Sequence, residues 1–388
     1  MSYRHFDVTT VQTPKRPGEP CGDVVAIERS ESATLVAICD GIGSGVRANL
    51  AANMCASRIL QMIRLGESAR TVFRSVSKTM NASRSYELPF AAFTIIQIRF
   101  DGSATSLSYE MPPPIYVSAC GATILDQQRF VDDEAIIFES HIRLDPGDGL
   151  LAMSDGITQA GLGNGLAEGW RSEGVCSYVS DLITHGRTLH EMPESVHEQA
   201  LKLSWNPRAH VPNYGDDCTA VMIACRAGRV VNILTGPPVD PRVDDDVVRK
   251  FLETDGLHVV CGATTAKIVA RYLHCPIEFI SDEDSMIAPP RSAIQGVDLV
   301  TEGAVTLNQT YNLIDEDARR FTEDSGVTRL CSLLREADRI NITVGHAANL
   351  GNNDIAFKQQ VILPRTAILP LLEQKLRDQG RLIVSSSV

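Results

Sequence analysis

The sequence predicts an α+β protein whose first part is built mainly from antiparallel strands and whose last part is a smaller α/β domain. In the first part, a strand-like run at 93–100, the dipeptide Asp101-Gly102 and a second run at 104–111 form the pattern of a β-hairpin. In the last part, apolar strand-like runs alternate with segments of helical spacing, which is typical of parallel strands covered by helices. We therefore place a domain boundary between residues 228 and 229.

The spacing of apolar residues predicts the elements of the first part. Val46, Leu50 and Met54 recur at helical spacing, and Gly66 is placed to end that helix. Further helices are predicted over 68–83 and within the segment between the acids at 155 and 216. Strands are predicted at 24–29, 33–39, 93–100, 104–111, 115–117, 135–138, 150–153 and 218–225.

The last part shows a regular alternation of the two kinds of element. Its predicted strands are 230–234, 257–260, 297–300, 340–344 and 382–385. Its predicted helices are 247–252, 266–273, 307–321, 327–337 and 367–378.

Acidic residues stand at the ends of several predicted strands. Asp40 and Asp155 each follow an apolar strand and precede a glycine. Asp216 and Asp217 come just before another apolar strand, and Asp23 opens a fourth. A single Asp-Gly step is most often an ordinary turn, so the recurrence of acids at strand ends is the informative feature.

These acids are expected to converge. In an antiparallel sheet, the C-terminal end of one strand and the N-terminal end of its neighbour lie on the same rim. Gathered carboxylates repel one another by about 4 kcal/mol per pair at 4 Å with an effective dielectric near 20, so the site needs cations. Oxygen ligands without His or Cys favour Mg²⁺ or Mn²⁺, and two such ions can bind a hydroxide and orient a phosphoryl group.

Bulk properties narrow the class of protein. The 388 residues are enough for two domains with cores of their own. A net charge of −12 argues against nucleic acid or an anionic membrane as the main partner. Ten cysteines without a C-x-x-C pair indicate core residues of a reducing compartment, and no stretch approaches eighteen apolar residues. We expect a cytoplasmic protein.

Five short segments follow one another in a fixed order between residues 20 and 226. They are Gly22-Asp23, Asp40-Gly41-Ile42-Gly43-Ser44-Gly45, Pro112-Pro113-Pro114, residues 146–158 (PGDGLLAMSDGIT) and Gly215-Asp216-Asp217-Cys218-Thr219. In content and order they resemble the PPM-type, metal-dependent serine/threonine phosphatases, specifically the bacterial SpoIIE-like branch. Each segment is short, but the ordered set is specific.

The resemblance implies a fold for residues 1–228 and the ligands of a first metal ion. The fold is a sandwich of two antiparallel β-sheets flanked by helices, with the metals at one end of the sandwich. Asp40 is expected to bridge two ions. Asp23 and the backbone carbonyl of Gly41 are expected to complete the first site.

The resemblance also implies a second ion and a reaction. Asp155 and Asp216 are expected to hold that ion, and Asp217 falls where the family often has a supporting Asp or Asn. With two Mn²⁺ or Mg²⁺ ions, metal-activated water hydrolyses phosphoserine or phosphothreonine directly, without a phosphoenzyme. The implied substrate is a phosphorylated bacterial regulatory protein, and a homodimer is left open. The catalytic residues are then Asp23, Asp40, Asp155 and Asp216.

The sequence departs from the family pattern at two places. Eukaryotic relatives have a histidine, a proposed general acid, where Ile42 stands, and SpoIIE-like members commonly lack it too. The Gly-His that usually precedes the proline run is Glu110-Met111 here. With no general acid at Ile42, the leaving serine would take its proton from water.

The last part resembles a domain appended to SpoIIE-like phosphatases that are encoded beside iron-only hydrogenases. The role of this domain is left open, and regulation is one alternative. Its segment 261–265 predicts either an anion site on backbone amides or a tight turn capped by threonine. Two further interpretations of the whole chain stay open. One is a catalytically weak, phosphatase-like module that docks a signalling partner, and the other is a nucleotidase or small-molecule phosphatase.

Overall fold

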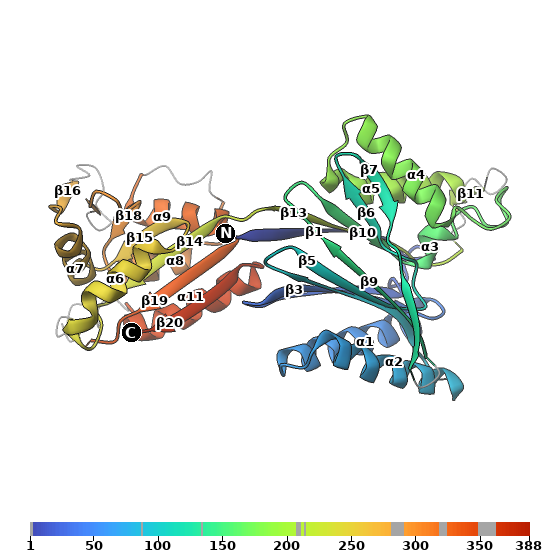
Figure 1. Cartoon of the computed structure of the whole chain (residues 1–388), viewed down its shortest axis with the longest axis horizontal. Helices are drawn as coiled ribbons and strands as arrows, with labels where there is room; N and C mark the ends of the chain where they lie inside the picture. Colours follow the sequence, from blue (N-terminus) through green and yellow to red (C-terminus); the bar gives the residue numbers. More distant parts are fainter. Residues whose placement is uncertain are drawn as a thin grey trace. The chain divides into compact units, whose positions relative to one another are not determined.

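The computed structural model divides into two compact units (Figure 1). We call Arg4–Ala227 the N-terminal unit, and Met1–Tyr3 with Gly228–Val388 the C-terminal unit. Within the described residues no helix has the length and apolar character needed to cross a membrane. The structure describes residues 3–86, 88–132, 135–206, 211–212, 215–280, 291–317, 324–347 and 362–388.

The N-terminal unit contains two antiparallel sheets. The six-stranded sheet has the order β2(Asp23–Arg29)-β3(Ala33–Gly41)-β4(Ala91–Arg99)-β5(Ser103–Tyr109)-β9(Ala135–Arg143)-β8(Gln128–Asp132). The five-stranded sheet has the order β1(Arg4–Thr13)-β13(Cys218–Ala227)-β10(Gly149–Met153)-β6(Ile115–Ser118)-β7(Gly121–Ile124). The predicted hairpin is β4–β5.

Strand β3 shows why the sheets stack. All nine of its residues are buried, and alternate side chains point to opposite faces of a strand. Ile38, of the six-stranded sheet, joins a core that also contains Leu150 and Ile223 of the five-stranded sheet. Cys39 points the other way, into a core shared with helices. The unit is therefore a β-sandwich, as expected from the sequence.

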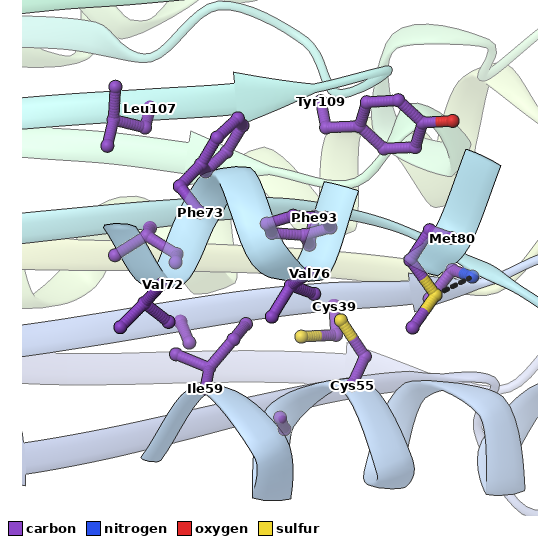
Figure 2. Close-up of a cluster of buried hydrophobic side chains, with 14 of the residues drawn as sticks. Cys39, Cys55, Ile59, Val72, Phe73, Val76, Met80, Phe93, Leu107 and Tyr109 are labelled. Carbon is purple, nitrogen blue, oxygen red and sulfur yellow. Dashed lines mark hydrogen bonds between the residues drawn. The ribbon is translucent and has the colours of Figure 1, made fainter. Parts of the chain in front are cut away.

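Helices cover both outer faces of the sandwich (Figure 1). On the six-stranded sheet, Figure 2 shows Phe73 beside Phe93, with ring centroids 4.9 Å apart, and Cys39 facing Cys55. None of the ten cysteines forms a disulfide. The covering helices are α1 (Gly45–Arg64) and α2 (Ala69–Ser85) on this sheet, and α4 (Arg171–Thr184) and α5 (Met192–Leu203) on the other.

Three short elements complete the described part of the connection between β10 and β13. They are α3 (Asp155–Thr158), the single turn η1 (Leu189–Glu191) and the two-stranded pair β11 (Trp205–Asn206) and β12 (Val211–Pro212).

The C-terminal unit is built on one mixed sheet. Its order is β16(Glu278–Ile280)-β17(Arg291–Ala293)-β18(Leu299–Thr301)-β15(Leu257–Cys261)-β14(Val230–Thr235)-β19(Arg339–Val344)-β20(Leu382–Ser387). The five strands from β18 to β20 are parallel, as predicted. Strands β16 and β17 add an antiparallel edge to this sheet. The sequence patterns did not predict them, because each has only three residues.

Helices lie on both faces of this sheet. One core packs α6 (Asp244–Glu253) and α7 (Ala263–Leu273) on one face, and a second packs the helices of the other face. The helix predicted over 307–321 is shorter than expected, and residues 318–321 lie outside the described residues. The remaining elements are η2 (Pro241–Val243), α8 (Ala304–Leu313), α9 (Gly326–Glu336) and α11 (Arg365–Asp378).

The turn before α7 is not capped by threonine, which was one of the two forms predicted for it. No side chain caps α7 at Gly262, which has a φ of 118°. The Thr265 hydroxyl instead accepts a hydrogen bond from the backbone N–H of Gly236, at 2.9 Å. The threonine therefore ties β14 to α7 and does not cap the turn.

Candidate functional site

The predicted site residues lie at the ends of strands from both sheets. Asp23 and Asp40 are direct partners in the antiparallel pairing of β2 with β3. Asp155 begins α3, directly after β10, and Asp216 and Asp217 directly precede β13. Because β10 and β13 are neighbouring antiparallel strands, their acidic ends share one rim.

Buried hydrogen bonds join the ends of the two sheets. The Thr219 hydroxyl of β13 donates to Asp23 Oδ2 of β2 at 2.6 Å, and Gln12 Nε2 donates to the Thr219 hydroxyl at 3.0 Å. The backbone N–H of Thr219 donates to Ser154 Oγ at 2.9 Å. The sequence analysis missed Gln12, Ser154 and Thr219 as site residues. A polar Thr219 inside an apolar strand was the available signal, because a fully buried hydroxyl needs a partner.

Three glycines allow the backbone to approach the acids closely. A Cβ atom at Gly41 would lie 1.9 Å from the backbone oxygen of Ala48, so only glycine fits between β3 and α1. At Gly156 a Cβ would lie 2.1 Å from the backbone oxygen of Asp217, and at Gly22 it would lie 2.6 Å from Asp217 Oδ2. The Asp-Gly pairs therefore have a packing reason that an ordinary turn lacks.

The carboxyl groups influence one another strongly. Burial, together with the charges of Asp23, Asp155 and Asp216, raises the pKa of Asp40 to about 9. Burial raises the pKa of Asp23 to about 6, against hydrogen bonds that lower it. Burial also raises the pKa of Asp155 and of Asp216. Four of the predicted acids therefore form one electrostatic cluster.

Asp217 plays a different part from these four. Its Oδ1 accepts a hydrogen bond from the backbone N–H of Lys15 at 2.8 Å, and its backbone carbonyl accepts one from the Ser154 hydroxyl at 3.4 Å. Its side chain is buried, with an exposed fraction of 2%. These contacts hold the loop after β1 and the end of β10 against the start of β13.

The donors suit a hard cation. In the described part of the chain, no three His, Cys, Asp or Glu side chains are arranged to hold a metal ion as they stand. Among the described residues, three buried carboxylate oxygens of the predicted acids nevertheless have no hydrogen-bond partner: Asp23 Oδ1, Asp155 Oδ1 and Asp217 Oδ2. Gln159 Nε2 donates to the other oxygen of Asp155, Oδ2, at 2.7 Å. Unpaired, buried anionic oxygens in an all-oxygen cluster fit Mg²⁺ or Mn²⁺ and not a softer metal.

A comparison with known protein families shows the family of this chain. The sequence model of the Stage II sporulation protein E (SpoIIE) family matches residues 30–226, more than half of the 388-residue chain. The match contains Asp40, Asp155 and Asp216 and begins after Asp23. No curated protein matches the chain.

Several solved structures are similar. The RsbU and RsbW domains of a Mycobacterium tuberculosis protein are 16% identical, with a TM-score of 0.47 over 65% of this chain and 69% of that chain. The PP2C phosphatase domain of SpoIIE from Bacillus subtilis, with a fragment of its regulatory domain, is 15% identical, with a TM-score of 0.48 over 58% and 65%. RsbX in complex with magnesium is 15% identical, with a TM-score of 0.39 over 57% and 96%.

Proposed function

Because the chain belongs to the SpoIIE family of PP2C-type phosphatases, we propose that it is a metal-dependent protein phosphatase acting on phosphoserine or phosphothreonine in a bacterial regulatory protein. The observation that carries this proposal is the cluster of buried Asp23 and Asp40 with half-buried Asp155 and Asp216, in which each carboxyl group has a raised pKa. Clustering like charges away from water destabilises the folded state. Such a cluster therefore indicates a functional site more readily than a contribution to stability.

The proposed metal ligands are carboxylates and one backbone carbonyl. Asp40 would serve both ions, a role supported by its electrostatic interaction with carboxyl groups at the strand ends of both sheets. Asp23 and the Gly41 carbonyl would serve one ion, and Asp155 and Asp216 the other. Two bound Mn²⁺ or Mg²⁺ ions would supply the hydroxide nucleophile and neutralise charge on the phosphoryl group.

Neighbouring residues orient these ligands. The Thr219 hydroxyl and the Gln159 amide each hold one oxygen of a carboxylate and leave its second oxygen without a hydrogen bond. Residues that hydrogen-bond to a metal ligand fix its direction, and their loss typically lowers metal affinity or activity about 10–100-fold. Asp217 supports the site by holding the backbone around it.

The chain offers no obvious side chain for proton transfer at the position after Gly41. Ile42 stands there, and 47% of its surface is exposed. An isoleucine neither donates nor accepts a proton, so the leaving serine or threonine would take its proton from water. We therefore expect a pH profile without the contribution of a histidine at this position.

One observation favours a second candidate function. Among the described residues, no three acidic side chains are arranged to hold a metal ion as they stand. A phosphatase-like module that docks a signalling partner, without turnover, would need no such arrangement. The presence of every predicted ligand acid counts against it, because a module without turnover would be free to lose them.

Hydrolysis assays distinguish these functions. We would measure the full chain on p-nitrophenyl phosphate, a phosphoserine peptide and nucleotides, with Mn²⁺ or with EDTA. We expect metal-dependent turnover that Asp155→Asn lowers by about 100-fold or more, since losing a ligand should cost at least as much as losing its partner. The matched control is Asp101→Asn, an exposed acid of the same unit outside the site.

Three results would contradict the proposal. Absence of turnover with any metal would favour the docking module. Equal loss in Asp155→Asn and Asp101→Asn would reject the site. Activity on nucleotides far above that on the phosphopeptide would instead favour a nucleotidase.

A further inference from the structure

The C-terminal unit contains a cavity that the phosphatase site does not use. It has a volume of about 440 Å³, which lies in the range of small-molecule sites. It is lined by residues of α6, including Val247, Lys250 and Phe251, and of strands β14, β19 and β20. All of these belong to one compact unit.

The cavity lies between α6 and one face of strands β14, β19 and β20. Sheets of parallel strands are normally covered by helices on both faces. Here the core formed by α6 and α7 includes residues of β14, β15 and β18 but none of β19 or β20. The opposite face of β19 and β20 does pack against helices, through Ile340, Ile342 and Ile383. We call the side of β19 and β20 that borders the cavity the open face, because among the described residues it joins neither hydrophobic core.

The open face is polar, and its polar groups are arranged in a chain of hydrogen bonds. Asn232 of β14 has an exposed fraction of 2%, and its Nδ2 donates to the Asp255 carbonyl at 3.2 Å. Asn341 Nδ2 donates to Asn232 Oδ1 at 2.7 Å, and Arg339 Nε donates to Asn341 Oδ1 at 2.8 Å. Two asparagines thus hold the plane of one guanidinium group at the cavity.

Two cationic side chains line the cavity. Arg339 and Lys250 both line the cavity, and no Asp or Glu is among the described residues that do so. This contrasts with a chain of net charge −12. A guanidinium held by hydrogen bonds is preorganised to bind a carboxylate or phosphate. The side chains of Val247 and Phe251 offer an apolar wall beside it.

We propose that this cavity is a binding site for a small organic anion. Its carboxylate or phosphate group binds Arg339 and Lys250, and its apolar body packs on Val247 and Phe251. At this site the buried Asn232 holds Asn341 in place. An asparagine in a central strand contributes less to the core than an apolar residue would, so this contact gives Asn232 a role. The inference is independent of the phosphatase activity proposed for the other unit.

Titration calorimetry of the full chain tests the site. The probes are phenylphosphonate, which carries a phosphate-like group that a phosphatase does not hydrolyse, phenylacetate and inorganic phosphate. We expect an aromatic anion to bind more tightly than inorganic phosphate, because only the former contacts the apolar wall. Arg339→Gln and Lys250→Gln should each weaken that binding at least tenfold.

The control variant is Lys267→Gln, an exposed lysine of α7 that does not line the cavity and should leave binding unchanged. Lys250 is also exposed, so its variant should fold, and circular dichroism would verify this for all three. Stronger binding of phenylphosphonate than of phenylacetate would indicate a phosphate ligand, and the reverse a carboxylate. Failure of both aromatic anions to bind, or equal weakening in all three variants, would overturn the proposal.

Discussion

Asp40 shows, at the scale of one residue, how a functional charge opposes folding. Burial and three neighbouring carboxyl groups raise its pKa to about 9, whereas an aspartate in an unfolded chain has a pKa of about 3.9. Between these values the folded state binds more protons than the unfolded state. The free energy of unfolding of the metal-free protein therefore decreases as the pH rises from about 4 to about 9.

We predict that Asp40→Asn stabilises the metal-free protein at pH 8 while it abolishes metal-dependent hydrolysis. With a pKa near 9 in the folded state and about 3.9 in the unfolded state, Asp40 must take up a proton when the protein folds at pH 8. A neutral asparagine folds without this unfavourable proton uptake. We expect a rise in Tm of roughly 2–4 °C, which corresponds to about 1 kcal/mol in a domain of this size. Thermal unfolding in EDTA at pH 8 and pH 5 measures it.

The gain should shrink at pH 5, because that pH is close to the pKa of the unfolded aspartate and the proton uptake on folding then costs less free energy. The control is again Asp101→Asn, which removes an exposed charge and should leave the difference between the two pH values unchanged. A lower Tm for Asp40→Asn than for the wild type at pH 8 would show that Asp40 is not under electrostatic strain.

At the scale of secondary-structure elements, the glycines of the Asp-Gly pairs bring strand ends together. Gly156 lies in α3 against the backbone of Asp217, which precedes β13. Its backbone needs no unusual φ, so the requirement for glycine is one of space. The same holds for Gly41 between β3 and α1.

We predict that Gly156→Ala destabilises the N-terminal unit and separates Asp155 from Asp216. A methyl group placed 2.1 Å from a backbone oxygen forces the two elements apart, and overpacking of this kind typically costs about 1–3 kcal/mol. Thermal unfolding and hydrolysis would both be measured.

The matched control is Gly215→Ala, in the loop that carries Asp216. A Cβ there meets nothing within 4 Å, and its φ is not in the left-handed region. It should retain the stability and activity of the wild type. Equal effects of the two substitutions would mean that the close approach of α3 to β13 is unimportant.

At the scale of the whole molecule, the two units have separate hydrophobic cores. Three core clusters belong to the N-terminal unit and two to the C-terminal unit, and none of these clusters combines residues of both. A chain with separate cores is not expected to unfold in one two-state transition.

We predict two transitions in scanning calorimetry of the full chain. Mn²⁺ should raise the temperature of only one of them, since a ligand stabilises the folded unit that binds it. Asp155→Asn should remove this shift and leave the other transition unchanged. A single transition that moves as a whole with Mn²⁺ would show that the units unfold cooperatively.

Most of the architecture could be predicted from the amino-acid sequence, and the recurrence of acids at strand ends was visible in it. Long apolar runs such as that of β3 and the hairpin of β4 and β5 are local patterns, and the SpoIIE-like segments stand in a fixed order. Elements without such patterns, such as β7, β16 and β17, were not predicted, because each has only three or four residues and pairs through contacts formed on folding.

The surroundings of the acids could not be predicted from the sequence, because they are formed by distant parts of the chain. Thr219 meets Asp23 across 196 residues of chain, and Asn232 meets Asn341 across 109, so neither partner can be inferred from spacing. The raised pKa of Asp40 likewise depends on burial and on charges from both sheets. A sequence pattern indicates which face of a single helix or strand is buried. A functional site, in contrast, forms where elements that are distant in the sequence pack together.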